Sequence, residues 1–208
     1  SNQQEAYDMC RHGFELSESV KLPVLLRITT RLAHSRSGVK PRTALSERSL
    51  QLPDDKRQFV LLPAIARRRY RRLIELQPRL MEAAQGSPFN FYEDGPDRSM
   101  GIVACGLGIN YVRESFTDGR PPHPLLKIGQ YPVPVNQLER MADECDRILV
   151  VEEGMPFVEE ALRGTLNRCV DVRGRMDGTL PPDGELTPNR LRVALGMESR
   201  SGEPVPDI

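Results

Sequence analysis

Three side chains that could bind a substrate stand close together near the start of the chain. Thr30, Arg31 and His34 follow the apolar run Leu22–Ile28, which the sequence predicts to be a strand buried in a parallel sheet. A hydroxyl, a guanidinium and an imidazole beyond a strand end could hold a carboxylate or orient a neighbouring subunit. The alternative is a polar surface loop, because loops are rich in polar residues.

Two adjacent acids form a second candidate. Glu152 and Glu153 follow the predicted strand Arg147–Val151, and ligands gather at the carboxyl edge of open sheets. Paired carboxylates there could act as general acid and base. The alternative is that one of them caps the next helix or pairs across an interface.

Two glycines between a predicted strand and a predicted helix form a third candidate. Gly106 and Gly108 stand where a dinucleotide-binding loop would hold a phosphate. Tyr111 replaces the third glycine of that fingerprint, and no acidic residue ends the second strand. A tight turn is therefore favoured over a nucleotide site.

The cysteines predict no metal site. Cys10, Cys105, Cys145 and Cys169 lie far apart, without a C-x-x-C pair or a histidine at ligand spacing. An iron–sulfur cluster needs closely spaced cysteines. We expect four buried thiols and no bound metal.

The elements that must position these candidates follow an α/β pattern in the second half of the chain. Short apolar runs alternate with helical segments, which is typical of parallel βαβ units with helices on both faces of a sheet. The predicted strands are Met100–Ala104, Leu125–Ile128, Arg147–Val151 and Cys169–Val172, and the predicted helices are Ile109–Phe116, Val135–Cys145 and Pro156–Leu166.

The rest of the chain is predicted to be helical or irregular. Apolar spacing predicts a helix up to Val20, a polar excursion over Thr29–Asp55, and a helix over Pro63–Gln85 that Pro78 would kink or divide. Turn residues predict a linker over Asn90–Asp97. Thr187 is predicted to cap a last helix that ends at Leu195, followed by disorder beyond Gly196.

Charge and hydropathy exclude several classes of partner. Lys plus Arg and Asp plus Glu both number 29, so no overall field favours nucleic acid or anionic membrane. The basic cluster Arg67–Arg72 is interpreted as a solvated or interdomain face. No apolar run approaches the roughly 20 residues of a membrane span, and no secretory signal is visible, so we expect a cytoplasmic protein.

A set of short motifs, in order along nearly the whole chain up to about Leu195, resembles the α subunit of indolepyruvate ferredoxin oxidoreductases. Each motif is weak alone, and the set is specific. The motifs are Gln4–Asp8, Phe14–Glu18, Leu22–Arg27, Thr29–Arg31 with His34–Arg36, Pro63–Ala64 with Ala66–Arg69, Ser87–Asn90, Leu126–Gly129 with Tyr131–Pro132, and Val151–Glu153.

The resemblance implies part of an enzyme that oxidatively decarboxylates indolepyruvate or other aryl pyruvates to acyl-coenzyme A and reduces ferredoxin. The full enzyme would use thiamine diphosphate with Mg²⁺ and [4Fe–4S] clusters, and would pair with a smaller β subunit. The diphosphate-binding motif and the cysteine-rich end of that family are not in this sequence. We therefore expect an internal piece of the subunit that binds no cofactor and is inactive alone.

The resemblance also implies a domain order. Residues 1–36 would end a pyrimidine-binding domain, 37–97 would be a linker with a helix, 98–173 would be an α/β domain similar to the transketolase C-terminal domain, and 174–208 would be an extension. Thr30, Arg31 and His34 are the expected substrate or interface residues. Two alternatives stay open: a nucleotide or acyl-ligand binding module that uses the Gly106–Gly108 turn, and an interaction scaffold that uses the Arg67–Arg72 helix.

Overall fold

The computed structural model describes residues 1–47, 49–166 and 170–200 of the chain. The chain divides into two compact units: Asn2–Ala83, and Ala84 onward together with Ser1. The elements are α1 (Gln3–Val20), α2 (Thr30–His34), the 3₁₀ turn η1 (Lys56–Phe59), α3 (Pro63–Gln85), β1 (Phe91–Glu93), β2 (Gly101–Cys105), α4 (Gly108–Ser115), β3 (Leu125–Ile128), α5 (Val135–Glu144), β4 (Arg147–Val151), α6 (Phe157–Thr165), β5 (Asp171–Arg173) and α7 (Pro188–Ala194).

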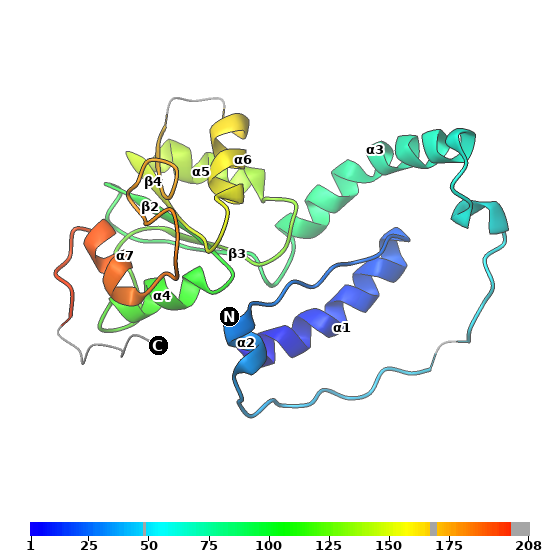
Figure 1. Ribbon diagram of the computed structural model, residues 1–208, viewed down its shortest axis with the longest axis horizontal. Helices are drawn as coiled ribbons and strands as arrows, with labels where there is room; N and C mark the ends of the chain where they lie inside the picture. The colour runs from blue at the N-terminus through cyan, green and yellow to red at the C-terminus, as the bar shows by residue number, and fades with distance from the viewer. Residues whose placement is uncertain (48, 167–169, 201–208) are drawn as a thin grey trace. The chain divides into compact units, whose positions relative to one another are not determined.

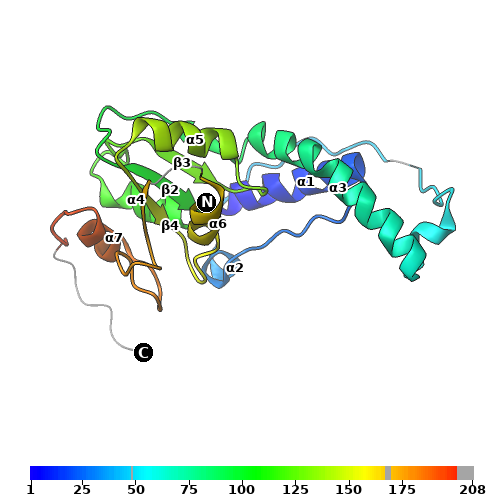
Figure 2. The same ribbon diagram turned by 90° about the horizontal axis from the view of Figure 1, so that it is seen from above.

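The second unit is built on one five-stranded sheet with the strand order β1-β3-β2-β4-β5. β2 pairs in parallel with β3 and β4, β4 pairs in parallel with β5, and β1 runs antiparallel to β3. Val103 stands in register with Leu126 on one side and Val150 on the other, and Figure 2 shows β2 between its two neighbours. The predicted parallel α/β fold is confirmed.

Two separate cores cover the two faces of this sheet. Ile102 and Ala104 point to the face covered by α4 and α7, whereas Val103 points to the face covered by α5 and α6. Figure 1 shows these two pairs of helices on opposite sides of the strands. Because β2 is buried on both faces, it is a continuous apolar run without polar alternation. The predicted three layers are confirmed.

The compact unit begins before residue 98 and continues after residue 173. Phe91–Glu93, which the turn residues around them assign to a linker, form β1 at the edge of the sheet. Beyond β5, Leu180, Leu186 and Leu191 are fully buried in the core on the α4 face. Burial of these leucines makes the extension a part of the fold.

Several predicted bounds match the structure closely. β3, β4 and α3 have the predicted bounds, and α3 is one helix that Pro78 does not divide. Thr187 caps α7 by accepting a hydrogen bond from the Arg190 amide at 3.3 Å, as predicted. The predicted strand at Cys169–Val172 is instead Asp171–Arg173, and Cys169 lies outside the described residues.

The first unit holds helices with little buried core. Asn2 caps α1 by accepting a hydrogen bond from the Glu5 amide at 2.9 Å, and Val20 is the buried residue of that helix. The prediction that Leu22–Ile28 is a buried strand is wrong, because Leu25 is 92% exposed and the run has no strand conformation. A parallel strand needs neighbours, and the described residues of this unit form no strand to pair with it.

The polar stretch Thr29–Asp55 is mostly irregular, as predicted, apart from the short helix α2. The prediction of four buried thiols is wrong for Cys10, which is exposed on α1. Among the described residues, no helix is long and apolar enough to cross a membrane.

Candidate functional site

The strand-end candidates come together where the chain changes direction in the sheet. β2 leads into α4 on one face and the adjacent β4 leads into α6 on the other, as Figure 1 shows. Ligand sites in doubly wound sheets lie beside the carboxyl ends of such a pair of strands. Gly106 and Gly108 follow β2 and the two adjacent glutamates follow β4, so the structure brings all four residues to this edge.

Glycine is favoured at the two positions for different structural reasons. Gly106 has a φ of 52°, in the left-handed region, and its amide donates to the Ile128 carbonyl at 3.2 Å. A β-carbon on Gly108 would stand 2.4 Å from the Val151 carbonyl oxygen, so this position needs glycine to let α4 begin against β4. Backbone conformation therefore explains Gly106 and packing explains Gly108, in agreement with the tight-turn interpretation.

Glu152 caps the helix that follows it. The residue is 5% exposed, and its carboxylate accepts hydrogen bonds from the backbone amides of Val158 and Glu159, each at 2.9 Å. Burial raises the pKa of Glu152, and the two amide hydrogen bonds oppose that rise. Because both carboxylate oxygens already hold the first turn of α6, the structure supports the capping alternative for this residue.

A second buried glutamate, missed by the sequence analysis, anchors the segment after β5. Glu159 is fully buried and accepts from the backbone amide of Arg175 at 2.7 Å and from the Arg163 side chain at 2.9 Å. The Arg175 guanidinium, also buried, donates to the Glu152 carbonyl at 3.0 Å. These bonds join residues as far as 23 positions apart along the chain, which no local pattern reveals.

Glu153 keeps a carboxylate that is available at this edge. One of its oxygens accepts a hydrogen bond from the Tyr111 hydroxyl at 2.8 Å, and the residue is half-buried. Tyr111, which replaces the third glycine of a nucleotide fingerprint, therefore links α4 to the end of β4. A phenol that holds a carboxylate can keep it oriented toward a cationic or hydrogen-bonding ligand.

Cys105, the last residue of β2, is a poor nucleophile. Burial raises the pKa of the Cys105 thiol well above its usual value, and the nearby Glu152 carboxylate raises it further. The reactive form of cysteine is the thiolate. At neutral pH this thiol stays protonated, so the edge of the sheet has no activated sulfur at this position.

An asparagine missed by the sequence analysis holds the loop after β3. The Asn90 side chain accepts from the amides of Gly129 and Gln130 at 2.8 and 2.9 Å, and donates to the carbonyls of Ala84 and Gln130 at 2.8 Å each. The residue is 5% exposed, and these four bonds use its whole hydrogen-bonding capacity. Asn90 therefore fixes the backbone between the sheet edge and the end of α3.

Lys127 is a buried cation within β3. The residue is 5% exposed, and its Nζ lies 5.5 Å from the centroid of the Phe91 ring. Burial lowers the pKa of Lys127 to about 8. This lysine faces the same core as Ala104, because the two residues are in register on neighbouring strands.

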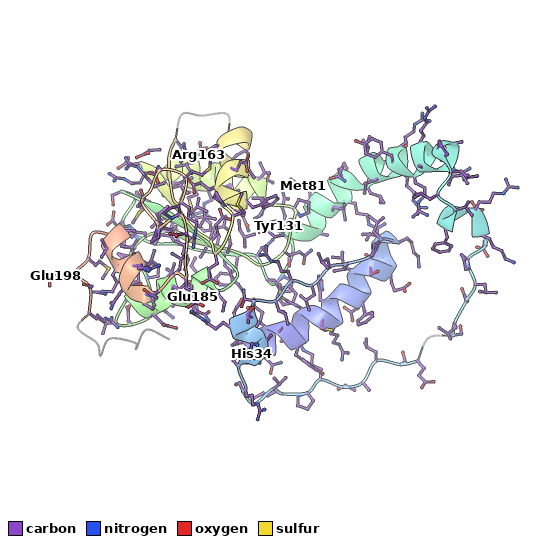
Figure 3. The ribbon with its side chains drawn as sticks, viewed as in Figure 1. His34, Met81, Tyr131, Arg163, Glu185 and Glu198 are labelled. Atoms are coloured by element: carbon purple, nitrogen blue, oxygen red, sulfur yellow. The ribbon has the colours of Figure 1, made fainter. Side chains whose placement is uncertain are left out.

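The structure places Thr30, Arg31 and His34 on the single helical turn of α2 (Figure 3 labels His34 there). Thr29 caps this turn by accepting from the Leu32 amide at 3.3 Å. At about 100° per residue the three side chains lie within about 100° of arc, so they share one face of the turn. All three are exposed, and the expected preceding strand is absent among the described residues.

The cofactors implied by the resemblance include metal ions, which proteins hold with clusters of side chains. Across 1–47, 49–166 and 170–200, no three His, Cys, Asp or Glu side chains gather where they could hold a metal ion. A Mg²⁺-bound diphosphate needs oxygen ligands and an iron–sulfur cluster needs cysteines. The described cysteines therefore provide no set of ligands for an iron–sulfur cluster.

Comparison with curated proteins decides the family. The chain is 37% identical to the indolepyruvate oxidoreductase subunit IorA of Methanothermobacter thermautotrophicus, and 100% of the chain is covered. It is 33% identical to the Pyrococcus abyssi subunit over 96% of the chain, and 32% identical to that of Archaeoglobus fulgidus over 94%. The chain is thus similar, over nearly its whole length, to one part of the IorA subunits. It spans only about a third of these relatives, 35%, 33% and 31% of their lengths.

The resemblance found in the sequence motifs is thus confirmed for the family. No family model matches the chain. Among solved structures, the 2-oxoglutarate:ferredoxin oxidoreductase of Magnetococcus marinus is similar at 17% sequence identity with a TM-score of 0.45, over 65% of this chain and 24% of that one.

Proposed function

We propose that the chain acts as part of an oxidoreductase that decarboxylates indolepyruvate or a related aryl 2-oxoacid. The observation that supports this proposal is the continuous identity of 32–37% to IorA subunits over nearly the whole chain. In this reaction the 2-oxoacid loses carbon dioxide and two electrons, its acyl group forms a thioester with coenzyme A, and the electrons reduce ferredoxin. The proposed partners are a smaller β subunit and ferredoxin, in the cytoplasm.

In this proposal the role of the chain is structural, and other sections of the subunit bind the cofactors. Thiamine diphosphate with Mg²⁺ and the [4Fe–4S] clusters would be held by sections of the subunit other than this one. Residues 1–36 would end a pyrimidine-binding domain, and the sheet of the second unit would be the domain similar to the transketolase C-terminal domain.

The test is activity of the full-length protein, produced together with the smaller subunit and supplied with indolepyruvate, coenzyme A and oxidised ferredoxin. We expect ferredoxin reduction that depends on the 2-oxoacid and on coenzyme A, and none from the 208-residue chain alone. Reduction with no dependence on any 2-oxoacid would contradict the proposal.

Arg31 on α2 gives a test of the proposed substrate or interface residues. Arg31→Ala should raise the KM for the 2-oxoacid or weaken assembly with the smaller subunit, because a guanidinium can hold a carboxylate by two hydrogen bonds. The matched control is Arg36→Ala, an exposed arginine just beyond the same helix. Unchanged KM and unchanged assembly for Arg31→Ala would rule out this assignment.

A further inference from the structure

The middle of α3 carries an exposed set of arginines. Five of the six residues from Arg67 to Arg72 are arginine, and all six are exposed. At about 100° per residue, Arg67, Arg68, Arg71, Arg72 and Arg79 lie within about 140° of the helix circumference. We name these five residues the arginine face.

The first unit itself leaves this face almost without partners. The Arg68 guanidinium lies 3.8 Å from an Asp55 carboxylate oxygen, a pair exposed on both sides. Within the described residues, Arg67, Arg71 and Arg72 form no ion pair or hydrogen bond through their side chains. These three positive charges have no ion-pair partner among the described residues, although Glu75 lies within the same arc, and they raise the local potential of a chain that has no net charge.

The residues around the arginine face favour a protein as the partner. Tyr70, Leu73 and Ile74 are 65%, 36% and 54% exposed on the remaining part of the helix surface. Arginine and tyrosine are enriched at the energetic centres of protein interfaces. The cluster contains no lysine, and the planar guanidinium suits paired hydrogen bonds to carboxylates.

We propose that the arginine face of α3 is a docking surface for a protein partner with a carboxylate-rich surface. The proposal goes beyond the enzymatic function proposed above and does not depend on it. The solvated-face interpretation of Arg67–Arg72 predicts that these arginines contribute no more to binding of a polyanion than arginines elsewhere on the chain.

The experiment measures binding of fluorescein-labelled poly-L-glutamate to the full-length protein by fluorescence anisotropy. The test variant is Arg67→Gln/Arg71→Gln/Arg72→Gln, and the matched control is Arg27→Gln/Arg120→Gln/Arg147→Gln, which removes as many exposed arginines elsewhere. Glutamine and arginine have similar helix propensity, so unchanged circular dichroism is expected. We expect binding by the parent protein that weakens steeply with salt, a loss of about tenfold in the test variant, and a change below about twofold in the control.

Four outcomes would overturn the proposal. Equal weakening in the test and control variants, or no binding by the parent protein, would mean that the arginine face is not a preferred acidic-protein site. Tighter binding of a single-stranded oligonucleotide of equal charge, lost in the test variant, would assign the face to nucleic acid. Binding to phosphatidylserine vesicles but not to poly-L-glutamate, lost in the same variant, would assign it to a membrane surface.

Discussion

Gly108 and Val151 meet where two strand ends of the sheet come together. A β-carbon on Gly108 would stand 2.4 Å from the carbonyl oxygen of Val151, closer than real β-carbons approach. The first residue of α4 therefore packs directly on the last residue of β4. A β-carbon on Gly106, in the same turn, would meet open space, so glycine is favoured there by its left-handed φ and not by packing. The two glycines of this G-x-G motif are therefore needed for different reasons.

Replacing these glycines should have unequal effects. Gly108→Ala should lower the free energy of unfolding by at least about 3 kcal/mol, because the new methyl group meets rigid backbone. Gly106→Ala should cost only about 1 kcal/mol, the usual penalty for a left-handed non-glycine residue. Urea unfolding followed by circular dichroism would measure both. Equal losses for the two variants would contradict the packing explanation.

The two adjacent glutamates should also differ. Glu152→Ala leaves two buried amides of α6 without acceptors and should cost about 3 kcal/mol of the free energy of unfolding. Glu153→Ala removes one half-buried hydrogen bond from the Tyr111 hydroxyl and should cost about 1 kcal/mol. The same unfolding measurement tests the pair, and a larger loss for Glu153→Ala would show that Glu152 is not the main cap.

Lys127 should make stability depend on pH. Its pKa is lowered to about 8 in the folded protein from the ordinary value of 10.5, so the unfolded chain binds more protons between these values. The contribution of Lys127 to the free energy of unfolding should therefore rise by about 2 kcal/mol between pH 8 and 10. The Cys105 thiol makes an opposing contribution in this range, because burial raises its pKa in the folded protein. Lys127→Met, which keeps the length of the side chain without the charge, should abolish that rise.

The pH range of this measurement has an upper limit. Burial, together with the Glu144 carboxylate, raises the pKa of Tyr92 to about 12. The unfolded chain loses the phenol proton from about pH 10 upward, so this tyrosine lowers stability above that pH. An unchanged slope between pH 8 and 10 in the Lys127→Met variant would show that another group causes the rise.

The sequence predicted the fold best where local patterns agree with burial. The bounds of α3, β3 and β4 follow from apolar spacing alone, because a helix stripe and a doubly buried strand have distinct signatures. The same reasoning failed at Leu22–Ile28. An apolar run indicates that a segment could be buried as a strand. It gives no information on whether neighbouring strands are present to pair with that segment.

The sequence predicted the position of the candidate site better than the roles of its residues. Gly106, Gly108, Glu152 and Glu153 were found because strand ends in a parallel sheet meet at one edge. The capping by Glu152 was one of two alternatives that the sequence left open. Asn90, Glu159 and Arg175 were missed because most of their partners lie 6 to 40 residues away along the chain. β1 was missed because its three residues stand among turn residues.

Asn90 provides the last prediction, since its four hydrogen bonds need both a donor and an acceptor. Asn90→Asp keeps the two bonds from the amides of Gly129 and Gln130 but brings a carboxylate within 2.8 Å of two carbonyl oxygens. We expect a loss of about 3 kcal/mol of the free energy of unfolding at pH 7. Part of the loss should be recovered at pH 4, where protonation restores one donor. The control is Asn136→Asp in the first turn of α5, exposed and near the positive end of the helix dipole, which should change stability by less than about 0.5 kcal/mol. Equal stability of the two variants would mean that Asn90 does not hold the loop after β3.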